Sequence, residues 1–339
     1  MHCSPIIKYY QLKTATTLLV VAVLFCLKVK AQSNIISVHD PVIIQQDSFY
    51  HIFCTGRGII HWSSKDLLHW QKEEPVFDTL PWAVQEITGF KNHIWAPDIS
   101  YYKGQYYLYY SISTFGKNNS AIGLATNTTL NPKDSNYKWI DHGKVFRSYA
   151  GVDRYNAIDP NFIIDKKGTP WLTFGSFWSG IKLIQLQEDG TALSATNREM
   201  YSIASRSKKD FPMADTSSTN GAIEAPFIYK KQQYYYLFVS FDLCCRGEKS
   251  TYKIAVGRSA NITGPYLDKN GIDMLYGGGT ILATGDANWY AVGHNGIASL
   301  NGKDYIIYHG YDVSDNGKSK LRLQELLWDT SGWPIISKN

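Results

Sequence analysis

The sequence is poor in charged residues. Only 19% of its 339 residues are Asp, Glu, Lys or Arg, whereas 44% are hydrophobic. The formal net charge is +5, but four lysines and no acid lie within the first 31 residues, so the remainder carries a net charge of +1. A chain this close to neutral has no excess of basic residues with which to bind nucleic acid, and it is compatible with a neutral substrate. We therefore expect no nucleic-acid partner.

Cysteine is also scarce. Of the five cysteines, only Cys54, Cys244 and Cys245 follow residue 31, and none of them forms a Cys-x-x-Cys pair. This spacing argues against a zinc site. The adjacent residues Cys244 and Cys245 leave two structural alternatives open, a vicinal disulfide or two buried thiols.

The apolar run at the N-terminus, Thr14 to Leu27, is shorter than the roughly 20 residues that a membrane-spanning helix needs. Two lysines precede it, and the small Ala31 follows it as a cleavage point, which is the pattern of a secretory signal. We expect residues 1–31 to be a signal peptide and residues 32–339 to form the mature domain. The mature protein would be secreted or periplasmic, without membrane contact. A retained membrane anchor is the alternative.

Long helical patterns are missing as well, since no extended stretch has apolar residues at helical spacing. Aromatic residues are abundant instead, at 14%, with 24 Tyr and 10 Trp. Tyr and Trp suit the half-buried surface of a pleated sheet. The composition therefore favours an all-β protein.

One pattern recurs five times along the chain. A polar residue close to a proline or an asparagine precedes a short apolar run, and a turn separates this run from a second one. Proline is tolerated at the first residue of a strand, so each lead residue is expected where a strand begins. The lead residues, 58 to 70 positions apart, are Asp40, Asp98, Asp159, Glu224 and His294.

Each unit has a third apolar run after its hairpin, and a fourth strand is plausible, for example from Tyr137 to Ile140. Five units of three to four strands predict a five-bladed β-propeller in a single domain. A β-sandwich or a pair of barrels is the alternative, but neither requires a polar residue at the head of every repeat. We expect residues 35–37 to close the ring by pairing with the last blade.

The propeller geometry gathers the lead residues. The innermost strand of each blade runs along the central channel, so residues at the heads of these strands should meet at one mouth of it. Cleavage of a glycosidic bond needs two facing carboxylates, one to protonate the leaving oxygen and one to activate water or attack the sugar. Asp40, Asp159 and Glu224 are the candidates, whereas Asp98, whose proline precedes it, is interpreted as structural.

The ordered set of motifs resembles glycoside hydrolase family 43, over roughly residues 34–330. The three main motifs are HDP at 39–41, AIDP at 157–160 and AIEAP at 222–226. Further elements resemble the endo-α-1,5-L-arabinanases of that family, namely 94–98, 175–180, 241–247 and 292–295.

The resemblance implies a five-bladed propeller and an inverting mechanism. Asp40 matches the general base, Glu224 the general acid, and Asp159 a third carboxylate that orients the acid and raises its pKa. These roles agree with the physics, because a carboxyl group stays protonated near neutral pH only if burial or a nearby negative charge disfavours its ionisation.

The resemblance also implies a metal site and sugar contacts. His294 matches a ligand for one calcium ion held otherwise by water, whereas a lone histidine read without the resemblance is structural. The predicted substrate-binding residues are Asp40, Trp95, Phe115, Gly116, Asn156, Ala157, Ile158, Asp159, Ser176, Phe177 and Trp178. For the aromatic members, core packing is the alternative. His309 is interpreted as a core residue or a hydrogen-bond partner.

The function that we predict is endo-hydrolysis of α-1,5-linked arabinan, linear or debranched, by a monomer. An exo-acting α-L-arabinofuranosidase or β-xylosidase of the same family is the first alternative. A non-catalytic sugar-binding propeller is the second, but such a protein would tolerate the loss of a carboxylate, and this chain keeps all three.

Overall fold

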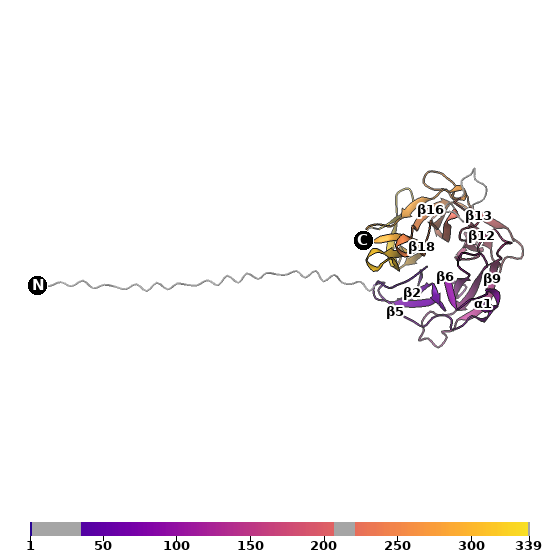
Figure 1. The fold of residues 1–339 in the computed structure, drawn as a ribbon, viewed down its shortest axis with the longest axis horizontal. Coiled ribbons are helices and arrows are strands. Elements are labelled where there is room, and N and C mark those ends of the chain that lie inside the picture. Colours follow the sequence, from indigo (N-terminus) through magenta and orange to yellow (C-terminus); the bar gives the residue numbers. More distant parts are fainter. Residues whose placement is uncertain (2–34, 207–220, 338–339) are drawn as a thin grey trace. The chain divides into compact units, whose positions relative to one another are not determined.

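The computed structural model describes residues 35–206 and 221–337, together with Met1 (Figure 1). The predicted signal peptide, apart from Met1, lies outside the described residues. By its contacts the chain divides into Met1–Ser33 and Asn34–Asn339, and all the strands described below belong to the second unit. Among the described residues, none of the helices has the length and apolar character needed to cross a membrane.

Five antiparallel sheets make up the second unit, and Figure 1 shows them around a ring. The first contains β1 (Val42–Gln46), β2 (Phe49–Cys54), β4 (Ile60–Ser64) and β5 (Gln71–Lys72). The second contains β3 (Gly56–Arg57), β6 (His93–Tyr102), β7 (Gln105–Ile112), β8 (Ser120–Asn127) and β9 (Ile140–Ser148). The third contains β10 (Asn161–Ile164), β11 (Pro170–Phe174), β12 (Ile181–Gln185) and β13 (Met200–Ala204).

The fourth sheet contains β14 (Ile223–Lys231), β15 (Tyr234–Phe241), β16 (Lys253–Ser259) and β17 (Thr280–Ala283). The fifth contains β18 (Trp289–Leu300), β19 (Lys303–Asp312), β20 (Lys318–Trp328) and β21 (Pro334–Ile336). Short helical turns join them at α1 (Pro81–Glu86), η2 (Gly247–Lys249), η3 (Met274–Tyr276) and η4 (Val313–Asp315). The prediction of a five-bladed, all-β propeller is confirmed.

The heads of the inner strands share one backbone feature. One residue in each sheet has a positive φ of 42° to 56°, in or beside the left-handed region that L-residues seldom occupy. These residues are Asp40, Ala96, Asp159, Ala225 and His294. In the second, fourth and fifth sheets a register shift in the pairing accompanies the kink. The repeated kink turns the chain at the mouth of the channel.

The kinks refine where the lead residues lie. Asp40 and Asp159 precede β1 and β10, as predicted. Glu224 and His294 lie instead within β14 and β18, and Asp98 lies within β6. The expectation that each stands before a strand is wrong for these three, because a bulge lets pairing continue on both sides of the kink.

The predicted strand from Tyr137 to Ile140 is also wrong in its bounds, because β9 only begins at Ile140. Residues 128–139 form a loop. The Lys138 N–H of this loop donates to the side chain of Asn127, the last residue of β8. The Trp139 ring packs edge-on against Phe53 of the first sheet, with ring centroids 5.8 Å apart. Its aromatic character therefore reflects packing between blades rather than strand pairing.

The N-terminal segment meets the last blade. The Leu321 N–H of β20 donates to the Ile36 carbonyl at 3.0 Å, and the Ser37 hydroxyl donates to the Ser319 carbonyl at 2.9 Å. The segment forms these bonds without being a regular strand. The expected closing contact is therefore present, although it is shorter than a strand.

Asp98 joins neighbouring blades. One carboxylate oxygen accepts from the Phe162 N–H of β10 at 2.8 Å, and the other accepts from the Asn161 amide at 3.3 Å. Asn161 in turn accepts from the Ile228 N–H of β14 at 2.8 Å. Asp98 is buried, and it lines a small channel cavity rather than the large one described below. These contacts support its interpretation as a structural residue.

Replacing Asp98 by alanine tests this role. The variant Asp98→Ala leaves the buried Phe162 N–H without its partner, so the free energy of unfolding should fall by about 1–3 kcal/mol. Denaturant unfolding of both proteins measures the difference. The exposed Asp78→Ala serves as the control and should stay within about 0.5 kcal/mol of the parent. Equal stability of the Asp98 and Asp78 variants would contradict the role.

Candidate active site

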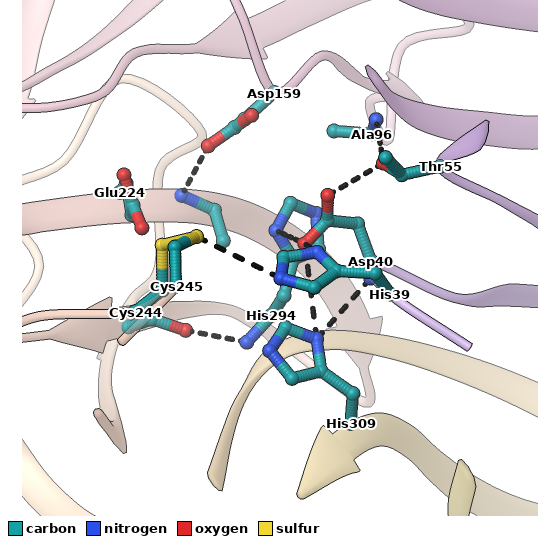
Figure 2. Close-up of polar contacts among 12 residues, drawn as sticks. His39, Asp40, Thr55, Ala96, Asp159, Glu224, Cys244, Cys245, His294 and His309 are labelled. Carbon is teal, nitrogen blue, oxygen red and sulfur yellow. Dashed lines mark hydrogen bonds and ion pairs between the residues drawn. A yellow bond between two sulfur atoms is a disulfide. The ribbon is translucent and has the colours of Figure 1, made fainter. Parts of the chain in front are cut away.

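A cavity of about 1000 Å³ opens where the inner strands begin. Its wall includes Asp40, Asp159, Glu224 and His294, which come from the first, third, fourth and fifth blades. Figure 2 shows the carboxylates of Asp40, Asp159 and Glu224 gathered with the imidazoles of His39, His294 and His309. The predicted convergence of the three carboxylates and His294 is confirmed.

Asp40 is buried and held at both carboxylate oxygens. Thr55 donates to Oδ2 at 2.6 Å, and the Thr55 hydroxyl accepts in turn from the Ala96 N–H at 2.8 Å. His294 Nδ1 lies 3.0 Å from Oδ1, and His39 Nδ1 lies 2.8 Å from the same oxygen. Burial opposes the charged form, but the two imidazoles outweigh it and hold the pKa of Asp40 well below its usual range. Asp40 is therefore the ionised carboxylate of the site.

The imidazoles differ in charge. Burial tends to lower the pKa of His294, yet the Asp40 charge beside it raises that pKa to about 9, so this ring is positively charged at neutral pH. His309 is fully buried, and burial, together with the neighbouring His39, holds its pKa well below the ordinary value, so this ring is neutral. Its Nδ1 accepts the Asp40 N–H at 3.2 Å. The interpretation of His309 as a buried hydrogen-bond partner is confirmed.

Glu224 has a different environment. The Ser176 hydroxyl and the Tyr252 hydroxyl each donate to one of its oxygens at 2.7 Å. Burial nevertheless raises the pKa of Glu224, against the effect of these two bonds. The Tyr252 ring can come this close because Gly293 precedes His294; a Cβ at Gly293 would lie 2.1 Å from that ring. Glu224 is the carboxyl group of the site suited to keep a proton.

Asp159 stands beside the acid. Its carboxylate accepts the Ala225 N–H at 3.1 Å, and its own N–H donates to the Ser111 hydroxyl at 2.9 Å. Burial is the largest influence; together with the charges of Glu224 and Asp40 it raises the pKa of Asp159 to about 8, against the positive charge of His294. Asp159 and Glu224 therefore form a coupled pair that gives up its last proton at a raised pH.

Most of the predicted substrate-binding residues line the cavity. Besides Asp40 and Asp159 these are Trp95, Phe115, Gly116, Asn156, Ile158, Ser176, Phe177 and Trp178. The Phe115 ring is 77% exposed, so it is not a core residue. Asn156 is oriented by the Ser120 hydroxyl, which donates to its Oδ1 at 2.7 Å.

Ala157 is the exception. It does not line the cavity, its side chain is fully buried in the core beside Phe174, and its N–H donates to the Ser148 hydroxyl at 3.0 Å. Ala157 therefore presents no side chain to the cavity, and its contact with substrate stays a prediction. It lies between two cavity residues in sequence, but the chain turns its side chain inward.

Several residues that line the cavity were not predicted from the sequence. They are His39, Thr55, His93, Thr114, Lys117, Leu243, Cys244, Cys245 and Arg246. His39 belongs to the HDP motif and could have been included on that ground. Cys244 and Cys245 form a disulfide, which decides between the two alternatives left open, and Cys54 is a buried free thiol. Thr55 and Tyr252 have no sequence signal, because only the fold brings them to the carboxylates.

His294 and its neighbours offer a few donor atoms that a calcium ion could use. Nδ1 is engaged by Asp40, so Nε2 is the nitrogen left for a metal, which would have to displace the proton that this nitrogen carries in the charged ring. His294 also lines a small cavity of about 10 Å³, beside Asn295, whose buried amide atoms have no partner among the described residues. An amide oxygen is a ligand that calcium accepts. The donors fit an ion whose remaining ligands are water.

A second cluster, His39, Asp40 and His309, also has its ligand atoms within 4.8 Å of one another. Both ring nitrogens of His309 are engaged, one by the Asp40 N–H and the other by the Tyr311 hydroxyl at 3.2 Å. This cluster is therefore a hydrogen-bonded network and not a cation site.

Known proteins resemble this chain over nearly its whole length. An extracellular exo-α-(1→5)-L-arabinofuranosidase of Cellvibrio japonicus is 45% identical over 316 residues, covering 93% of this chain and 90% of the relative. An extracellular endo-α-(1→5)-L-arabinanase of Bacillus subtilis is 46% identical over 301 residues, covering 87% and 86%. The solved structure of a Cellvibrio cellulosa α-L-arabinanase complexed with arabinohexaose superimposes with a TM-score of 0.84 at 44% identity, covering 89% and 96%.

The family assignment rests on a match over most of the chain. Glycosyl hydrolases family 43 matches residues 34–334, a range that contains β1 to β20 and all three cavity carboxylates. Together with the relatives, this match agrees with the resemblance that the HDP, AIDP and AIEAP motifs indicate. The chain is a glycoside hydrolase and belongs to glycosyl hydrolases family 43.

Proposed function

We propose that this enzyme hydrolyses α-1,5-L-arabinofuranosidic linkages inside arabinan chains by an inverting mechanism. The main supporting observation is that one cavity lowers the pKa of Asp40 and raises the pKa of Glu224. Glycoside hydrolysis needs one carboxylate and one carboxylic acid at the same pH. The names of the Cellvibrio and Bacillus relatives support arabinan as the substrate.

In this mechanism Glu224 protonates the oxygen of the leaving sugar. Tyr252 keeps its proton, because burial raises the pKa of its hydroxyl well above the ordinary value, and with Ser176 it fixes the orientation of Glu224. Asp159 and Glu224 do not both ionise readily, because burial and the charge of Asp40 raise the pKa of each, so the pair retains one proton to higher pH. The contribution of such proton transfer is about 10²–10⁴-fold.

Asp40 accepts a proton from the attacking water. It stays ionised because His294 and His39 lie beside it, and Thr55 limits its rotation. Attack from the face opposite the leaving group inverts the anomeric configuration. Proton NMR of the product formed first should show an inverted anomeric configuration. A retained configuration would contradict the role of Asp40 as the base.

The cavity suits an oligosaccharide. About 1000 Å³ is at the upper end of the range for small-molecule sites, so it has room for more than one sugar unit. Exposed Phe115, with Phe177 and Trp178, offers apolar surface for sugar rings. These features favour cleavage within a chain as the first choice. Exo-cleavage is the second candidate, because the Cellvibrio relative is named an exo-enzyme.

Export is part of the proposal. Residues 1–31 have the pattern of a secretory signal, and the two curated relatives are named extracellular. A polymer such as arabinan is met outside the cell. The mass of the exported chain would reveal a cut near Ala31.

One calcium ion at His294 is also proposed. His294 would hold it through Nε2, with water completing the coordination. The ion would displace the Nε2 proton of His294, and its two positive charges in place of one would favour ionised Asp40.

The product pattern tests the function. Debranched linear arabinan should yield a ladder of oligosaccharides, since internal cleavage releases fragments of many sizes, and chromatography of early time points displays them. Glu224→Gln should lower kcat on this polymer by about 10²–10⁴-fold. Xylan serves as the control polymer. Monosaccharide as the sole early product would contradict the endo mode, and near-parental activity of Glu224→Gln would contradict its role as the acid.

The pH profile tests the coupled pair. Catalysis needs protonated Glu224, so kcat should fall as pH rises through the raised pKa of the Asp159–Glu224 pair. Asp159→Asn removes one negative charge, which lowers the pKa of Glu224, so this descending limb should move to lower pH. Measurement of kcat from pH 5 to 10 on a soluble arabinooligosaccharide records the descending limb of the parent and of the variant. An unmoved descending limb would contradict the coupling.

Removal of divalent ions tests the metal. Chelation should lower both activity and melting temperature, and added calcium should restore them, because a ligand at about 100 times its Kd stabilises the native state by about 2.7 kcal/mol. Elemental analysis before and after chelation shows whether an ion was bound and removed. Full activity and an unchanged melting temperature in metal-free protein would contradict a functional ion.

A further inference from the structure

The disulfide between Cys244 and Cys245 lies on the wall of the catalytic cavity. Its two residues line that cavity together with Asp40 and Glu224, and Cys245 is exposed. The mechanism described above gives it no role. Cys245 has a φ of +64°, a conformation that L-residues seldom adopt, and the bond to its neighbour restrains the chain there. The question is what this restrained segment touches.

One contact leads directly to the carboxylate of Asp40. Cys245 Sγ lies 3.7 Å from His39 Nε2, and the other nitrogen of the same ring, Nδ1, lies 2.8 Å from Asp40 Oδ1. Figure 2 shows the sulfur and the carboxylate on opposite sides of the His39 ring. A single imidazole therefore spans the distance from the disulfide to Asp40.

A second path leads to the backbone of Asp40. The Cys245 N–H donates to the Tyr311 hydroxyl at 2.7 Å, and this hydroxyl lies 3.2 Å from His309 Nε2. His309 Nδ1 accepts the Asp40 N–H at 3.2 Å. Tyr311 and His309 are both buried, so water does not compete for these bonds. The disulfide segment is thus tied to Asp40 at two points.

The protons in this network have one consistent arrangement. Neutral His309 accepts at Nδ1, so it carries its proton on Nε2 and donates to Tyr311. Tyr311 then accepts from both His309 and Cys245, which leaves its own proton for His39 Nε2, 3.4 Å away. In this arrangement His39 Nε2 accepts from Tyr311, so its 3.7 Å contact with Cys245 Sγ, a sulfur that carries no hydrogen, is a packing contact and not a hydrogen bond. His39 Nδ1 lies 2.8 Å from Asp40 Oδ1, within ion-pair distance but without the geometry of a hydrogen bond, so the disulfide fixes the place of this ring by packing and that of Asp40's backbone through hydrogen bonds.

We infer that the Cys244–Cys245 disulfide is a positioning element for Asp40, acting through His39 and through Tyr311 and His309. The inference rests on the proposed role of Asp40 as the base. Misplacement of a catalytic group by about 1 Å can cost about 10²-fold in rate. Opening the disulfide should therefore lower kcat by about 10- to 100-fold and leave KM within about twofold.

Reduction opens the disulfide without a mutation. Dithiothreitol delivers two electrons and two protons, so the Cys244–Cys245 bond becomes two thiols and the reagent becomes its cyclic disulfide. The first experiment measures kcat and KM of the exported enzyme before and after reduction. Both measurements are made well below the melting temperature of each form. Mass spectrometry after alkylation confirms two new thiols. The double variant Cys244→Ser/Cys245→Ser is the matched control, because its kcat should not respond to dithiothreitol.

Two substrates separate the base from the acid. An aryl arabinofuranoside with a good leaving group depends little on Glu224, whereas its hydrolysis still needs an activated water. Reduction should therefore lower kcat by a similar factor on the aryl substrate and on linear arabinooligosaccharide. A loss confined to the oligosaccharide, or a rise in KM with unchanged kcat, would overturn the inference, since it would make the disulfide a part of the sugar-binding wall.

Tyr311→Phe provides a second route that leaves the disulfide in place. Loss of the hydroxyl breaks the path to His309, so this variant should lose kcat, and reduction should then lower kcat by a smaller factor than it does in the parent. If reduction lowered kcat by the same factor in the parent and in Tyr311→Phe, the path through Tyr311 and His309 would be overturned. Equal kcat of oxidised and reduced parent would overturn the inference as a whole. Absence of arabinan cleavage by the oxidised parent would instead refute the proposed function.

Discussion

The active site depends on the kink that each inner strand makes at its head. Asp40, Ala96, Asp159, Ala225 and His294 occupy equivalent positions with positive φ, and four of the five are followed by proline. The kink ends or shifts the regular pairing, so these residues or their neighbours turn toward the channel rather than into a blade. Five repetitions around a closed ring bring side chains from distant parts of the chain into one cavity.

The cavity then treats similar groups in opposite ways. Asp40 and Glu224 are both buried carboxyl groups, and burial alone would favour the neutral form of each. Two imidazoles and a hydroxyl beside Asp40 compensate for the burial, whereas Glu224 has only hydroxyl donors and lies near Asp159. One carboxyl group is therefore ionised while the other keeps a proton. The Asp98 carboxyl has a third, structural role, because it accepts a backbone hydrogen bond from the neighbouring blade.

Much of this was accessible from the sequence. The repeated motif predicted the number of blades, the location of each inner strand and the convergence of Asp40, Asp159, Glu224 and His294, because strand periodicity and proline placement are local properties. The differences from the structure are local as well. Ala157 was predicted to bind substrate although its side chain is in the core, and a strand was predicted from Tyr137 although β9 begins at Ile140 and Trp139 packs against the neighbouring blade.

The sequence by itself therefore determined the five-bladed architecture and the identity of the carboxylates, since both are encoded in residue type and order. Only the tertiary structure decided what surrounds those carboxylates. Thr55 and Tyr252 reach Asp40 and Glu224 from the same blade, 15 and 28 positions away, whereas His309 and the Tyr311 beside it come from the fifth blade, His309 lying 269 positions from Asp40. Their contacts, and the disulfide beside them, follow from how the blades close around the channel, and no local pattern specifies that closure.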